Sequence, residues 1–118
     1  MKTKYENVEQ VATRLLELCA IEPSDYPIEG ELGIGVSDFM GNKDGVRIIN
    51  NELEAKDLLI GILKTAHQVG YICSFYVCPD NREIMLETMA VFQENIDEGL
   101  DEEEIMEWGE LTIVVYKD

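Results

Sequence analysis

The chain has 118 residues, of which 25 are acidic and nine are basic, and its net charge at pH 7 is −16. A field of this sign repels nucleic acids and anionic membranes and attracts basic protein surfaces, so we expect no direct binding to DNA, RNA or lipid. With 46% hydrophobic residues the chain can still bury a core, and its length predicts one domain over residues 1–118.

The first part of the chain predicts a helix followed by a strand. Apolar residues recur at three- and four-residue steps over residues 5–20, which is typical of an amphipathic helix. Two prolines and a glycine in residues 21–30 end this pattern. Residues 32–37, LGIGVS, alternate and predict a half-buried strand, in which Gly33 and Gly35 let a helix pack closely or mark a bulge.

A hairpin and a long helix come next. Residues 40–45, MGNKDG, end in an Asp-Gly pair that favours a tight turn, so residues 46–50 are predicted to be the returning strand. Residues 52–69 carry a wide apolar face at helical spacing and predict the central helix. Gly70 is predicted to end it, since glycine commonly follows the last residue of a helix.

The second half predicts two further strands with a helix between them. Residues 71–78, YICSFYVC, are expected to form a strand that closes in the turn Pro-Asp-Asn. The spacing of methionines and other apolar residues predicts a helix over residues 82–98, ending at Gly99. Residues 111–116, LTIVVY, are apolar on both alternations and predict a strand covered on both faces.

Between these elements lies the most acidic stretch of the chain. Six of the twelve residues from Gly99 to Glu110 are acidic. With Asp101 as N-cap, Glu104 takes the third helical position and completes a pair that resembles a capping box. Carboxylates are also favoured in the first turn of a helix by its unpaired N–H groups. The stretch therefore predicts a short acidic helix that ends near Trp108.

These elements follow one another in the order α-β-β-α-β-α-α-β, which predicts an α+β fold with about four strands, three longer helices and one short acidic helix. The beginning of the chain, MKTKYENVEQ, lacks the apolar core of a secretory leader, and the longest apolar run is too short to cross a bilayer. Three cysteines, an odd number, fit a reducing compartment. We therefore expect a cytoplasmic location.

The candidate binding residues are acidic. Residues 81–118 contain twelve acidic and two basic residues, a net −10. On the predicted short helix Glu103 and Glu107 share the outer face, and Asp97, Glu98 and Glu110 lie close to its ends in sequence. A solvated helix face and a contact site for a basic partner both explain this pattern. The second explanation assigns these five carboxylates to partner binding.

Few residues offer catalytic or metal-binding chemistry. His67 is the one histidine, which excludes metal sites built on two or more histidines of one chain. Cys73 and Cys78 are five residues apart on a predicted strand, so their sulfurs lie on opposite faces and cannot share a metal. The calcium-like loop at residues 40–51 has Met40 and Asn51 where carboxylate ligands should be. No metal and no cofactor are expected.

Three functional hypotheses follow. The first is a non-enzymatic acidic module that binds a basic protein surface, for example an inhibitor that occupies the nucleic-acid site of its target. Phage-encoded anti-CRISPR proteins and immunity proteins are analogous in size and charge alone. The second is a small enzyme or ligand-binding domain that uses His67 in a concave pocket. The third is a structural or assembly subunit with an exposed apolar patch. The sequence leaves the oligomeric state open.

Overall fold

The computed structural model describes residues 2–19, 32–37, 43–49, 52–70, 72–80, 82–87, 93, 96, 97, 99 and 102–117. Within these ranges the elements are, in chain order, β1 (Lys2–Tyr5), α1 (Val8–Leu18), β2 (Leu32–Ser37), β3 (Lys43–Ile49), α2 (Glu52–Val69), β4 (Ile72–Cys78), β5 (Glu83–Glu87), β6 (Glu102–Trp108) and β7 (Leu111–Lys117). The predicted α+β class is confirmed. The predicted count is wrong, because the described ranges contain seven strands and two long helices.

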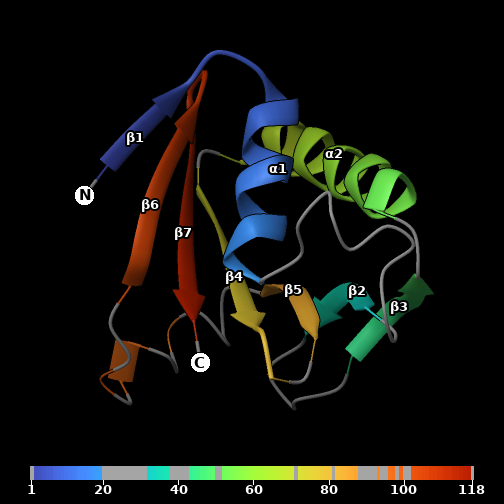
Figure 1. Ribbon diagram of the computed structural model, residues 1–118. Coiled ribbons are helices and arrows are strands. Elements are labelled where there is room, and N and C mark those ends of the chain that lie inside the picture. The colour runs from blue at the N-terminus through green and yellow to red at the C-terminus, as the bar shows by residue number, and fades with distance from the viewer. Residues whose placement is uncertain are drawn as a thin grey trace.

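All seven strands form one mixed sheet in the order β1-β6-β7-β4-β5-β2-β3 (Figure 1). Three antiparallel pairs join strands that are neighbours in the chain: β2 with β3, β4 with β5, and β6 with β7. Parallel pairing then sets β7 beside β4, β5 beside β2, and β1 beside β6. The sheet is therefore built from three hairpins laid side by side, and the N-terminal strand is added at one edge.

Both helices cover the same face of this sheet (Figure 1). α1 begins later than predicted because the Asn7 side chain caps it: Asn7 Oδ1 accepts a hydrogen bond of 3.0 Å from the backbone N–H of Gln10. α2 has the predicted bounds and ends before Gly70, whose N–H donates to the Ala66 carbonyl at 3.0 Å. Beneath the helices lies a core whose fully buried members include Leu15, Leu59, Leu63, Phe75, Met106 and Val115. Neither helix is long and apolar enough to span a membrane, as judged over the described residues.

The β2–β3 hairpin is confirmed, but its turn is not where the sequence placed it. Asp44 and Gly45 belong to strand β3, and Asp44 pairs with Val36. The register of the two strands shifts between Ile34 and Val36, where Gly45 and Val46 of β3 lie opposite Gly35 alone. A bulge is therefore present, but its extra residue lies on β3 and not on β2, where Gly33 and Gly35 were thought to pack against a helix or to mark a bulge. The beginning of the predicted turn lies outside the described residues.

The predicted helix over residues 82–98 is wrong at its start, where strand β5 forms. Ile84 and Met85 are adjacent and are 0% and 2% exposed, so both faces of this strand are covered. A strand buried on both sides has no alternation of apolar and polar residues, and the spacing of Met85 from later apolar residues fits a helix by coincidence. Of the later residues in this range, Gln93, Ile96 and Asp97 are helical.

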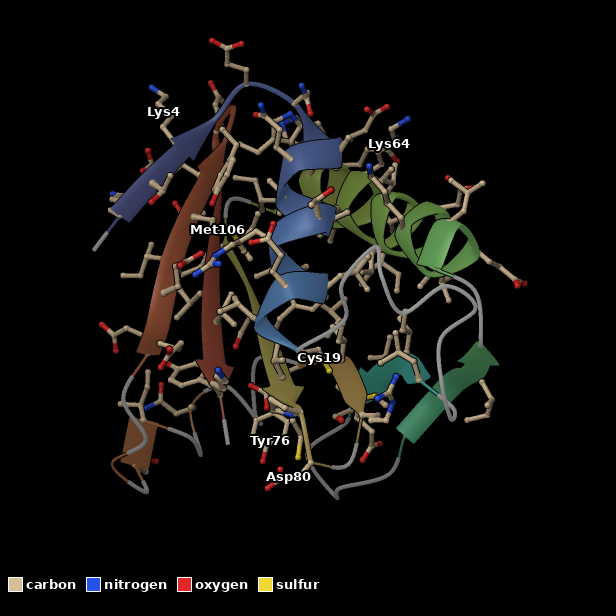
Figure 2. The ribbon with its side chains drawn as sticks, viewed as in Figure 1. Lys4, Cys19, Lys64, Tyr76, Asp80 and Met106 are labelled. Atoms are coloured by element: carbon tan, nitrogen blue, oxygen red, sulfur yellow. The ribbon has the colours of Figure 1, made fainter. Side chains whose placement is uncertain are left out.

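The predicted short acidic helix is wrong, because residues 102–108 form strand β6. Trp108 pairs with Leu111 across a two-residue turn in which Gly109 has a φ of +60°. β6 lies between β1 and β7, and Met106 is fully buried under α1 (Figure 2). Burying one such side chain stabilises by about 1.5–3 kcal/mol, whereas a helix cap contributes about 0.5–2 kcal/mol. Hydrogen bonding to β1 and β7 adds to the stabilisation from burying Met106, so residues 102–108 form a strand and not a helix.

Candidate functional site

The five sequence-predicted binding residues do not form one helical stripe. Glu103 and Glu107 lie on β6, and Glu110 lies in the β6–β7 turn. Four residues of extended strand span about 13 Å, more than twice the separation expected between Glu103 and Glu107 on a helix. Asp97 is exposed and accepts a hydrogen bond of 3.3 Å from Gln93 Nε2. Glu98 lies outside the described residues.

Glu107 is neutralised by the edge strand of its own sheet. Lys2 on β1 places its Nζ 2.8 Å from Glu107 Oε1, and the parallel register sets Lys4 directly beside Glu107. The hydrogen bond from Lys2, together with the charge of Lys4, lowers the pKa of Glu107 below its usual value. Exposed lysines also protect the edge of a sheet from pairing with another chain, and Lys4 projects from β1 in this way (Figure 2). Glu107 therefore has a partner within the fold.

Glu104 is held by helix α1, a contact that sequence reasoning missed. Arg14 binds the Glu104 carboxylate through two nitrogen atoms. Nε lies 3.1 and 3.0 Å from the two carboxylate oxygens, and Nη2 lies 2.8 Å from Oε1. Arg14 Nη1 also donates to Glu17 at 3.1 Å. These hydrogen bonds raise the pKa of Arg14 above its usual value, so its guanidinium stays charged. Arg14 and Glu104 are 90 residues apart, and no local sequence pattern signals their contact.

Three acids of the β6–β7 hairpin remain exposed without compensation. Glu102 and Glu103 at the start of β6 and Glu110 in the turn are exposed, and none of them forms an ion pair with any residue that the structure describes. We call these three residues the uncompensated acids. Glu110 is roughly 20 Å from Glu103 by strand geometry, so the three form a dispersed acidic surface with two members at one end.

His67 lies at the junction of α2 and the hairpin turn. Its ring stacks against Trp108 with a centroid separation of 4.8 Å and an angle of 42° between the planes. The backbone of Gly109 also comes close, since a Cβ atom there would lie 3.3 Å from His67 Nε2. His67 thus has a packing role between the helix and the turn. It does not line the groove described next.

A large apolar groove lies beside α2, between this helix and the sheet. Its volume is about 520 Å³, within the range of small-ligand pockets. Its walls are the α2 residues Leu58, Ile62 and Ala66 and the strand residues Val36, Cys73 and Leu86. Cys73 is half-buried, and the desolvation of its thiol raises its pKa to about 12, which keeps it protonated and unreactive at neutral pH. The groove was not predicted, and the one sequence feature that could have indicated it is the wide apolar face of α2.

The polar features of the groove are few. Asp57 is exposed at its rim, and Glu87 also lines it. Glu87 is 8% exposed and accepts a hydrogen bond of 3.1 Å from the Ser74 hydroxyl. Across the described ranges, no group of three or more His, Cys, Asp or Glu side chains is arranged to hold a metal ion. The groove is therefore suited to binding an apolar group.

Comparison of the chain with protein-family models, with curated proteins and with solved structures found no match. The acidic surface of the hairpin and the groove beside α2 are thus the features from which function must be inferred. The acidic surface offers carboxylates that form no ion pair with the described part of the chain, and the groove offers apolar surface open to solvent. Both properties are typical of binding surfaces.

Proposed function

We propose that this protein is a non-enzymatic binding module that presents its acidic surface to a basic surface of another protein. The observation that supports the proposal is the division among the acids of β6 and its turn. Glu104 and Glu107 are neutralised by Arg14 and Lys2, and the uncompensated acids are left to solvent. Net charge then steers a basic partner toward the molecule.

The contact residues of this proposal are the uncompensated acids together with Asp97 and Glu98, which lie just before β6 in the chain. Glu107 contributes less, because Lys2 already satisfies it. An inhibitor that covers the basic nucleic-acid site of its target is one form of this function. The spacing of about 13 Å along the strand favours general charge complementarity over a match to each phosphate of one DNA strand.

Affinity capture with charge-reversed variants tests the proposal. The immobilised protein is exposed to nuclease-treated lysate of the source organism at low and high salt. The test variant carries Glu102→Lys and Glu103→Lys, and the control carries Glu6→Lys and Glu9→Lys. Both changes move the net charge from −16 to −12. The control residues are exposed near the other end of β6, since Tyr5 pairs with Trp108.

We expect a basic protein that binds the wild type and the control, is released by salt, and is lost from the test variant. This result would show that the position of the acids matters as well as their number. If both variants lose the protein equally, its binding reflects net charge alone and the assigned contact site is wrong. If no basic protein is retained at low salt, the proposed function is wrong.

A further inference from the structure

The groove beside α2 is long enough for a secondary-structure element of a partner. Its lining runs along the helix from Asp57 to Val69. Twelve residues of helix rise about 18 Å, which equals roughly three helical turns. The apolar lining at one end of the groove is open to solvent, since Val69 and Ile72 are 83% and 45% exposed. A macromolecular segment covers such a strip better than a compact small molecule does.

Gly61 leaves a notch in the helix surface at the middle of this strip. A Cβ atom added at Gly61 would meet nothing within 4 Å, so the fold itself does not need glycine here. Glycine in a helix interior is destabilising relative to alanine. Gly61 and Thr65 lie one turn apart in the groove lining, and small residues at this spacing let another backbone approach a helix closely.

The charge of the groove favours a basic occupant. Among the described residues of its lining, Asp57 and Glu87 are acidic and none is basic, and Asp57 is the exposed one of the two acids. A second copy of the chain would bring a further −16, and an anionic membrane is repelled for the same reason. The apolar walls and the acidic rim together fit a segment that is apolar on one side and basic on the other.

We propose that this groove binds an amphipathic helix of the basic partner. The apolar face of that helix packs between Leu58, Ile62 and the sheet, its backbone approaches α2 at Gly61, and a lysine or arginine on its flank pairs with Asp57. The inference rests on the proposed function, because it names the element through which the basic partner docks. This mode is the helix-in-groove recognition used by other small domains.

Binding of designed peptides to the whole chain tests the inference. The probe is a labelled 18-residue helix of leucine and lysine with all leucines on one face, titrated at physiological salt and followed by fluorescence anisotropy. A matched peptide has glutamate in place of lysine. Gly61→Leu fills the notch without a change of charge. Gln68→Leu is the control, because it is the same kind of apolar addition on α2 at an exposed residue outside the groove lining.

We expect the leucine–lysine peptide to bind the wild type and Gln68→Leu with equal affinity. Its affinity for Gly61→Leu should be at least tenfold lower. The leucine–glutamate peptide should not bind any of the three proteins. Equal binding to Gly61→Leu and Gln68→Leu would overturn the inference, as would equal binding of the two peptides. Decylamine that shifts amide signals of α2 in an NMR titration, in the absence of peptide binding, would overturn it in favour of a small-molecule pocket.

The variant with Glu102→Lys and Glu103→Lys separates this inference from the proposed function. Loss of the peptide from Gly61→Leu alone supports the groove, because no described residue of β6 lines it. Loss from the lysine variant alone overturns the groove, because the peptide would then bind at the acidic surface. Failure of the inference is therefore read from these titrations, whereas failure of the proposed function is read from the affinity capture of the basic partner.

Discussion

Replacing Gly61 with alanine should stabilise the protein, although Gly61 lines the groove beside α2. Gly61 is in the middle of the 18-residue helix α2. Alanine is favoured over glycine in a helix interior by about 1 kcal/mol. The new methyl group meets no atom within 4 Å, so no steric term opposes this gain. We expect the free energy of unfolding to rise by about 1 kcal/mol and the midpoint of thermal unfolding to rise by about 3–6 °C.

The same substitution at Gly109 should have the opposite sign. Gly109 has a φ of +60°, a left-handed conformation that costs other residues about 1–2 kcal/mol. Its Cβ atom would also lie 3.3 Å from His67 Nε2, which forces the imidazole to shift on Trp108. We expect Gly109→Ala to lower the free energy of unfolding by about 1–2 kcal/mol.

Urea unfolding followed by circular dichroism measures both effects under one protocol. The slope of the unfolding free energy against urea should be equal in the three proteins, so that the midpoints report stability directly. A Gly61→Ala variant that is less stable than the wild type would refute the reasoning, because it would mean that the space beside Gly61 is occupied. Equal changes of the urea midpoint in Gly61→Ala and Gly109→Ala would show that backbone conformation and the space around each glycine do not decide the effect on stability.

Two ion pairs lead to further predictions. Arg14→Met should lower the free energy of unfolding by about 1 kcal/mol, because it removes the hydrogen bonds that Nε and Nη2 of Arg14 donate to the Glu104 carboxylate. The effect stays small because the Arg14 side chain is 36% exposed and water screens the ion pair in the wild type. A double-mutant cycle with Glu104→Gln measures the coupling, and a value near zero would contradict the contact. Lys2→Met should raise the pKa of Glu107, which NMR titration can follow, and an unchanged value would show that the ion pair does not form in solution. Since the folded state lowers this pKa, the stability from the pair is present above the unfolded pKa and is lost as the pH falls through the folded one.

The sequence by itself determined the α+β class and the elements whose patterns are local. α2 has the predicted bounds because its apolar face and the following glycine act within one helix. Strands β2, β4 and β7 were predicted within a residue or two, since runs rich in valine, isoleucine and aromatic residues bounded by turn residues are read from adjacent positions. The acidic charge of the last third was also local information.

Only the tertiary structure decided the strands that depend on distant partners. The capping-box-like residues Asp101 and Glu104 favour a helix locally, but β6 gains two neighbouring strands and buries Met106 beneath α1. The N-terminal strand β1 exists only because β6 lies beside it. The groove and the uncompensated acids also depend on which residues from distant parts of the sequence lie side by side. Whether a carboxylate meets a basic side chain or solvent depends on residues as far apart as Arg14 and Glu104, and hydrophobic periodicity within a short window cannot encode such a contact.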